Sequence, residues 1–575
     1  MTTLRTAKRF VFPLLGLWIL LYGSFSLVKP PLLDGPDALN AEIAREMLVG
    51  GHWITPYANG IPWALHPPLL YWTVACSFGL FGVSDWAARL PTALATLALF
   101  IATFSLGRRF FRSPAAAFYS ALALITSYGV FLFGHLLLRD VFLCLWTTLA
   151  LNFFWRSLSQ KKHLLGTSLG FGAACALGVL SEGVPGVLFP VLIAVLYLAF
   201  TGQTRHLIRW QAIPSVLIFL AIVLPWHIAS RIAAGQMRFD VLMPRWEGGR
   251  VPLFIFWPLL LLWIVPWCAF SLRALRIGDS PDPERRRQAR LFCLIWIFVV
   301  LVFFSFTARL EFNVLTALPP MALLAGGWLA EDESLPHHQG RISAAIVFFF
   351  GLAAAGLVAY YLIVSPVPAP GADIATLLHA DPGDHAVFFG YFLDLTRAAM
   401  GAFKVPLAIT LAALLAGVSG GLWFRLRDNA RWANCFLAGM MVAILIAAHI
   451  ALNTFSPVLS SQILAEAIKP EVQSTDIVVV NGAFESASSV AFYLDRPVLI
   501  LTEPGVLPAG ISSASGPQVF IGKAKLSSLW SESSRVWLWS TPASLPVLPG
   551  PSYVIGRSGG KEMISNHPNT GGASF

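Results

Sequence analysis

Charged residues are scarce in this chain of 575 residues: Asp, Glu, Lys and Arg make up 12% of it, whereas hydrophobic types make up 57%. A soluble domain usually carries about a quarter charged residues, so water alone cannot solvate such a chain. The net charge of +10 comes from short basic clusters between apolar runs and not from one continuous face, which argues against nucleic-acid binding. The composition indicates an integral membrane protein.

Two further patterns are missing. The six cysteines lie inside apolar segments without a CxxC pair, so neither a disulfide framework nor a thiolate metal site is predicted. Ionisable residues are almost absent from the middle of the apolar segments, with His449 as the clearest exception. Since ion and proton pathways need charges within the bilayer, a flippase or permease is the disfavoured alternative. A non-catalytic scaffold whose tail binds a partner is another alternative.

About thirteen segments are long and apolar enough to cross the hydrocarbon core, which takes about 20 helical residues. They are residues 10–28, 89–107, 114–134, 139–155, 164–180, 184–201, 211–229, 252–272, 290–306, 313–330, 342–364, 403–424 and 433–452. Basic residues recur in alternate loops, which predicts a cytoplasmic N-terminus. The stretch 69–83 is too short to span and would invert every later loop, so we expect it to be interfacial or re-entrant on the outer side.

The pattern predicts an all-α polytopic membrane protein with a small C-terminal soluble α/β domain. Residues 1–455 form the membrane domain, and residues 456–575 form the soluble domain on the outer side. The long outer loop 29–86 is expected to carry interfacial helices, among them an amphipathic helix from Asp37, which can cap it. In the tail, a helix is expected over 486–494, and strands are expected over 476–480, 497–501, 518–521 and 536–539.

Polar residues gather on the predicted outer side, where the loops that connect the spans carry an unusual set. They include Asp34, Asp37, Glu42, His52, His66, Arg139, Asp140, Glu182, Arg309, Glu311 and the loop from Arg238 to Arg250. Aromatic residues such as Trp63 and Tyr71 are interpreted mainly as belt residues of the membrane interface, some of which could line a lipid groove. This distribution favours chemistry at the outer membrane surface.

Several segments carry a family resemblance in the order in which they occur. They are LLDGPDALNAEIAREMLVGGHWITPYANG (32–60), HPPLLYW (66–72), FGVSDWAARLP (81–91), LLLRD (136–140), GVLSEGVPGVLFP (178–190), LPWH (224–227) and FSFTARLEFNVLTALPPMALLAGG (304–327). They resemble the polyprenyl-phosphate glycosyltransferases of the GT-C superfamily, the group that contains the lipid A aminoarabinose transferase and the protein O-mannosyltransferases. The resemblance implies an enzyme that moves a sugar from a polyprenyl phosphate, with inversion, to a hydroxyl or phosphate acceptor on the outer face.

The resemblance also implies roles for the outer-side residues. The catalytic carboxylate that orients or deprotonates the acceptor is Asp37, with Asp34 as runner-up, although Pro36-Asp37 stands where the family has two adjacent acidic residues. The donor phosphate is assigned to Arg309, His66, Arg89 and Arg139, and the acceptor or sugar to Asp140, Glu42, Glu182 and Glu311. His66 and Glu182 occupy positions where the family commonly has lysine.

For each residue a simpler structural role is also open. Asp37 could only cap a helix, Arg139 and Asp140 could only form an ion pair, and Arg309 could only anchor the membrane interface. The expected partners are a polyprenyl-phosphate sugar donor, a lipid, glycan or protein acceptor, and membrane lipids. We expect no nucleic acid and no cofactor, a monomer, and a location in the bacterial inner membrane. No metal-ligand spacing identifies a metal, and a divalent metal at His66 with an outer-loop carboxylate stays open.

Overall fold

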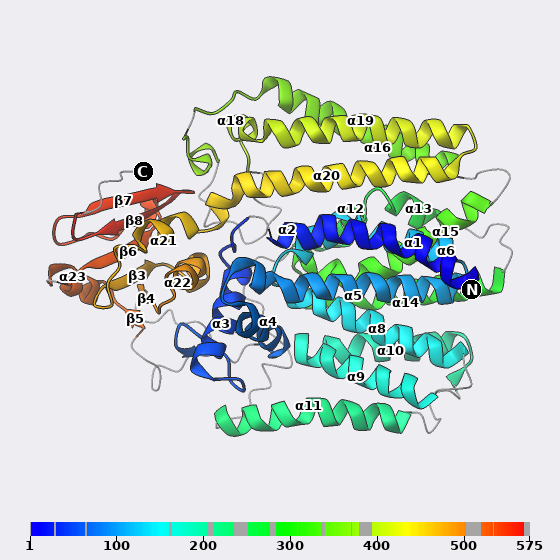
Figure 1. Cartoon of the computed structure of the whole chain (residues 1–575), viewed down its shortest axis with the longest axis horizontal. Helices are drawn as coiled ribbons and strands as arrows, with labels where there is room; N and C mark the ends of the chain where they lie inside the picture. The colour runs from blue at the N-terminus through cyan, green and yellow to red at the C-terminus, as the bar shows by residue number, and fades with distance from the viewer. Residues whose placement is uncertain are drawn as a thin grey trace.

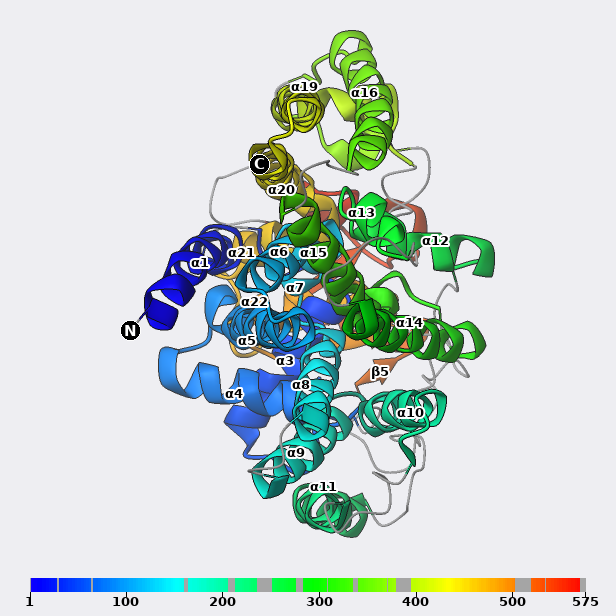
Figure 2. The ribbon, with the colours of Figure 1, turned by 90° about the vertical axis from the view of Figure 1, so that its right-hand side faces the viewer.

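The chain is a bundle of roughly parallel helices with a sheet domain packed against one end, and the N-terminus lies at the other end (Figure 1). The computed structural model describes residues 2–27, 30–63, 66–159, 164–204, 212–234, 251–275, 283–307, 309–334, 340–369, 371–378, 394–501, 519–532 and 534–568. Viewed along the bundle, α16 and α19 stand at one edge and α11 at the opposite edge, with α5, α8 and α15 between them (Figure 2).

Each of the thirteen predicted spans contains helix. Their helices are α1 (Thr2–Trp18), η1 (Ile19–Gly23), α2 (Ser24–Leu27), α5 (Asp85–Phe111), α6 (Pro114–Ile125), α7 (Tyr128–Gly134), α8 (Arg139–Ser159), α9 (Leu164–Glu182), α10 (Pro185–Phe200), α11 (Ala212–Ala234), α12 (Leu253–Trp263), α13 (Cys268–Arg273), α14 (Pro283–Phe306), η4 (Glu311–Ala317), α15 (Leu318–Ser334), α16 (Arg341–Val364), α18 (Arg397–Met400), η7 (Gly401–Phe403), α19 (Lys404–Leu426) and α20 (Ala430–Leu459). Within the described residues, ten helices are long and apolar enough to cross a membrane. The chain is therefore a multi-pass membrane protein.

Three of the predicted spans differ from a single long helix. The helices α10 and α12 are shorter than a full span, and α6 and α7 meet at a bend of 57°. At that bend the hydroxyl groups of Thr126 and Ser127 donate to the carbonyl groups of Leu122 and Leu124. Such side-chain bonds compete with the helical backbone ladder, so α6 stops there and α7 starts in a new direction.

The soluble domain contains a six-stranded sheet of order β5-β4-β3-β6-β8-β7. The strands are β3 (Ile477–Asn481), β4 (Leu499–Leu501), β5 (Phe520–Ile521), β6 (Val536–Ser540), β7 (Tyr553–Ser558) and β8 (Lys561–Ser565), and the helices are α21 (Gln462–Ile468), η8 (Phe484–Ala487), α22 (Ser488–Leu494) and α23 (Lys523–Ser531). The four predicted strands and the predicted helix are present. The β7–β8 hairpin was not predicted, although its Gly559-Gly560 turn, with positive φ at both residues, is a typical hairpin signal.

The first outer loop is wedged between the bundle and the sheet domain (Figure 1). It holds α3 (Pro36–Gly50), the short strands β1 (Tyr57–Ala58) and β2 (Ile61–Pro62), and α4 (Leu69–Phe81). The prediction that Asp37 caps this helix is wrong, because Gly35 is the N-cap residue of α3 and Asp37 lies in its first turn. The helix is also buried on nearly all sides, because its charged face, expected in water, meets the soluble domain through an Arg45–Asp495 ion pair.

Candidate active site

Asp37 connects three separate parts of the chain at the end of the bundle that faces the sheet domain. Its Oδ2 accepts hydrogen bonds from the Leu33 N–H at 3.0 Å and from Arg89 Nη2 at 2.8 Å. Its Oδ1 accepts from the Leu137 N–H at 3.0 Å, and the side chain is almost fully buried. A carboxylate offers about four acceptor positions, so three donors leave one for a substrate.

Arg89 holds the loop that leads to Asp37. Besides its ion pair with Asp37, it donates to the carbonyl oxygens of Pro30 and Pro31, the latter at 2.8 Å. Both Nη atoms are therefore used by the protein itself. Arg89 is thus the partner of Asp37, whose carboxylate balances its charge, and its role as a helper for the donor phosphate stays a prediction.

A second group of charges lies two residues beyond Leu137, where α8 begins and α9 ends. Arg139 Nε lies 3.7 Å from Glu182 Oε2, and Arg139, Asp140 and Glu182 are all buried. The close packing of α8 against α9 brings these residues together, although they are more than 40 positions apart in the chain. We call Arg139, Asp140 and Glu182 the rim cluster; it sets two carboxylates against one guanidinium.

Two residues of the outer loop face the rim cluster. Burial lowers the pKa of His66 well below its usual value, and the positive charge of Arg139 lowers it further. Burial also raises the pKa of Tyr71 to about 12, with smaller opposing effects of Arg139 and Glu182. Tyr71 is fully buried at this site, whereas its sequence surroundings predicted a residue of the interface belt. Its sequence neighbours are mostly apolar, so nothing in the sequence indicated that it lies near the rim cluster.

The lowered pKa of His66 predicts a measurable pH dependence. The unfolded chain titrates near 6.5, whereas the folded protein keeps His66 neutral below that value. As the pH falls below about 6.5, the unfolded state therefore binds the extra proton, and stability falls by up to about 1.4 kcal/mol per pH unit. Between pH 6.5 and 5.5 the wild type should lose more thermal stability in detergent than His66→Gln. Equal slopes for the two proteins would contradict a neutral, buried His66.

Asp34 faces away from these groups and binds the soluble domain. Its carboxylate accepts from the Ser489 N–H at 2.9 Å, from Ser461 Oγ at 2.9 Å and from Lys561 Nζ at 2.8 Å. Both side chains of the Asp34–Lys561 pair are 8% exposed. Asp34 is thus engaged in the domain contact, and we retain only Asp37 as the candidate catalytic carboxylate.

The other predicted residues have different surroundings. Glu42 binds Arg45 through both carboxylate oxygens, at 2.7 and 2.8 Å, and is fully buried. Arg309 donates to the carbonyl oxygens of Val251 and Ser305, both at 2.9 Å, and Glu311 is buried at the start of η4. The loop from 238 to 250 lies outside the described residues. Glu42 is therefore the partner of an internal arginine, and Arg309 joins α14 to the segment that begins at Val251.

Among the described residues, no group of three or more His, Cys, Asp or Glu side chains is arranged to hold a metal ion.

Comparisons with known proteins identify several that are similar to this chain in sequence. The family model "Dolichyl-phosphate-mannose-protein mannosyltransferase" matches residues 65–228. An undecaprenyl phosphate-alpha-4-amino-4-deoxy-L-arabinose arabinosyl transferase from Pseudomonas aeruginosa is 30% identical over 372 residues, which is 61% of this chain and 66% of that protein. The enzyme of the same name from Edwardsiella ictaluri is 25% identical and aligns over 87% of both chains.

The fold is similar to that of a solved structure over nearly the whole chain. The crystal structure of ArnT from Cupriavidus metallidurans bound to undecaprenyl phosphate has a TM-score of 0.77 at 20% identity and covers 97% of this chain and 98% of its own. The apo structure of the same protein matches equally well, with a TM-score of 0.77. By sequence and by fold, we therefore place the chain among the polyprenyl-phosphate glycosyltransferases of the GT-C superfamily, beside the aminoarabinose transferases.

Proposed function

We propose that the protein is an inverting glycosyltransferase that moves a sugar from a polyprenyl-phosphate donor to an acceptor on the outer face of the bacterial inner membrane. One observation supports this most: the buried carboxylate of Asp37 and the rim cluster lie together, joined by Leu137, at the outer end of apolar spans. A lipid-linked donor already has a good leaving group, so the enzyme needs a carboxylate for the acceptor and cations for the phosphate.

In this mechanism Asp37 uses its remaining acceptor position to bind the acceptor hydroxyl and to take up its proton as the new glycosidic bond forms. The bond from the sugar to the phosphate oxygen breaks on the opposite face of the sugar, which inverts the anomeric centre. Arg309 binds the departing phosphate, and Arg139, with its guanidinium at the start of α8, is the second candidate for this role. The N-terminus and the basic loops are cytoplasmic, and the sheet domain is periplasmic.

The charges of the rim cluster favour an amino sugar. Asp140 and Glu182 bring two carboxylates to one guanidinium, and His66 is neutral because burial lowers its pKa. When Arg139 pairs with Glu182, the buried Asp140 carboxylate can hold a negative charge only if a further positive charge comes beside it, because a buried charge is stable only when it is paired. The ammonium group of 4-amino-4-deoxyarabinose, the sugar named for the Pseudomonas relative, supplies that charge. The acceptor is a lipid, as opposed to a glycan or protein.

The direct test uses the purified chain in proteoliposomes with undecaprenyl-phosphate-linked 4-amino-4-deoxyarabinose that is radiolabelled in the sugar. Label should pass to lipid acceptors from a Gram-negative outer membrane, and the matched donor that carries 4-hydroxy arabinose should react much more slowly. No transfer from either donor, in a protein that is folded by thermal-unfolding assay, would contradict the proposal. Equal rates with the two donors would contradict the role of the excess carboxylate.

A further inference from the structure

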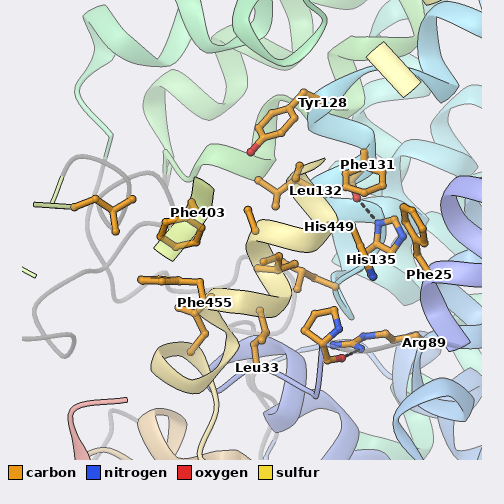
Figure 3. Close-up of a pocket in the computed structure, with 17 residues that line it drawn as sticks. Phe25, Leu33, Arg89, Tyr128, Phe131, Leu132, His135, Phe403, His449 and Phe455 are labelled. Atoms are coloured by element: carbon orange, nitrogen blue, oxygen red, sulfur yellow. Dashed lines mark hydrogen bonds between the residues drawn. The ribbon is translucent and has the colours of Figure 1, made fainter. Parts of the chain in front are cut away.

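A cavity of about 90 Å³ lies at the same end of the bundle, with Leu33 and Arg89 in its lining (Figure 3). We call it the rim cavity, and its walls come from α2, the loop after it, α5, α7 and α20. Most of its lining is apolar, for example Phe131, Leu132, Leu452 and Phe455. An apolar cavity between helices suits a hydrocarbon chain.

The polar end of the rim cavity touches the candidate catalytic residue. Leu33 and Arg89 both line the cavity, and both donate a hydrogen bond to Asp37. Asp37 also contacts Leu137, which leads to the rim cluster. The carboxylate thus contacts the lining of the apolar cavity through Leu33 and Arg89, and the segment that leads to the rim cluster through Leu137.

His135 offers a hydrogen-bond acceptor to this end of the cavity. Its Nδ1 lies 2.6 Å from the carbonyl oxygen of Phe131 (Figure 3). Its ring stacks on that of Tyr22. A carbonyl oxygen can only accept, so Nδ1 carries the proton, and in the neutral ring Nε2 presents a lone pair. His135 is 9% exposed, and Nε2 has no hydrogen-bond partner among the described residues.

Arg89 offers the complementary donor. Its two Nη atoms are bound to Asp37, Pro30 and Pro31, but its Nε is buried without a partner in the described part of the chain. A buried polar group without a partner costs free energy, which a ligand that binds it recovers. A hydroxyl group both donates and accepts, so it can serve His135 Nε2 and Arg89 Nε. A phosphate fits less well, because Asp37 already balances the charge of Arg89.

We propose that the rim cavity binds a hydroxyl-bearing hydrocarbon chain of the acceptor lipid, with His135 Nε2 as hydrogen-bond acceptor and Arg89 Nε as donor. The assignment to the acceptor rests on the proposed function, whereas binding of the chain does not. His449, which also lines the cavity and stacks on Phe25 with ring centroids 4.0 Å apart, lies beside His135, with the two histidine ring centroids 6.4 Å apart. The protein thus has separate binding sites for the chain of the acceptor lipid and for the donor lipid.

The test uses two photoreactive probes, a long-chain alcohol with a diazirine in its chain and the methyl ether of the same alcohol. The full-length protein in phosphatidylcholine nanodiscs is irradiated with each, and labelled peptides of α7 and α20 are quantified by mass spectrometry. The alcohol should label these peptides several-fold more than the ether in the wild type. Equal labelling by the two probes would overturn the role of His135 and Arg89 without any variant being made.

Variants separate the hydrogen bond from the apolar cavity. His135→Phe should abolish the preference for the alcohol, whereas His135→Gln should keep it, because the glutamine oxygen can replace Nε2. Leu452→Trp should fill the cavity and suppress labelling by both probes; Leu415→Trp, on the exposed face of α19, is the matched control. Undiminished labelling in Leu452→Trp would refute the cavity as the site.

Competition between undecaprenyl phosphate and the alcohol probe tests whether the rim cavity binds the acceptor lipid or the donor lipid. Undecaprenyl phosphate should not displace the alcohol probe if the cavity serves the acceptor, and displacement would overturn that assignment. If the transfer assay fails while the alcohol still labels the wild type in preference to the ether, the proposed function falls and the chain-binding site stands.

Discussion

Replacing Asp37 with asparagine is expected to lower the transfer rate by about 10²- to 10⁴-fold, the usual contribution of a positioned general base. Asparagine keeps the shape of the side chain and one acceptor oxygen, but it cannot take the proton of the acceptor. The measurement is kcat and KM for transfer of the labelled sugar in proteoliposomes. The loss should appear in kcat, because the donor is held mainly by Arg309 and the rim cluster.

A control variant separates a loss of catalysis from a loss of folding stability. Asp37→Asn leaves the Arg89 charge buried with a neutral partner, which costs about 3–5 kcal/mol when a buried ion pair is broken. The double variant Asp37→Asn/Arg89→Gln removes both charges, so its apparent unfolding temperature should recover while its transfer rate stays low. If the double variant transferred sugar at the wild-type rate, Asp37 would be a packing residue and not a catalytic one.

Replacing Lys561 with methionine is expected to loosen the soluble domain from the bundle. Asp34 would keep only its neutral donors, Ser461 and Ser489, and the loss of a buried charge partner costs about 3–5 kcal/mol. Limited proteolysis should cut earlier in the tail, and the unfolding temperature in detergent should fall. Transfer should fall as well, because Asp34 lies three residues before Asp37.

Lys525→Met is the matched control, since Lys525 is an exposed lysine on α23 of the same domain. An exposed charge contributes at most about 1 kcal/mol to stability, so this variant should behave like the wild type. Asp34→Asn/Lys561→Met, which removes both charges of the buried pair, should regain much of the lost stability. Unchanged proteolysis and transfer in Lys561→Met would mean that the soluble domain does not position the site.

The spans were predictable because a run of apolar residues that crosses a bilayer is a local property of the sequence. The rim cluster followed from the same reasoning, since Arg139, Asp140 and Glu182 each lie at the end of a span that topology puts on one side. Strands of the tail were found where β-branched runs alternate with turns. The broken α6–α7 pair was missed because it depends on two hydroxyl groups, Thr126 and Ser127, inside an otherwise apolar run.

The remaining contacts could not be predicted because they join positions far apart in the chain. Asp34 and Lys561 are separated by 527 positions, and only docking of the sheet domain brings them together. The same is true of Tyr493, which accepts from the Leu32 N–H and donates to Asp85. His135 was missed for another reason: a histidine next to an apolar helix has no sequence signal that separates a packed ring from a ligand-binding one.

The loop before Asp37 takes part of its fixed geometry from residues that are synthesised more than 400 positions later. The N–H groups of Asp34 and Gly35 donate to the carbonyl groups of Leu459 and Glu485, both at 2.7 Å, and Lys561 comes later still. During translation, Asp37 and Arg89 are therefore made long before the sheet domain that fixes their loop has folded. A chain that is released before residue 561 lacks the Asp34–Lys561 pair, so we expect sugar transfer to begin only after the sheet domain has been made.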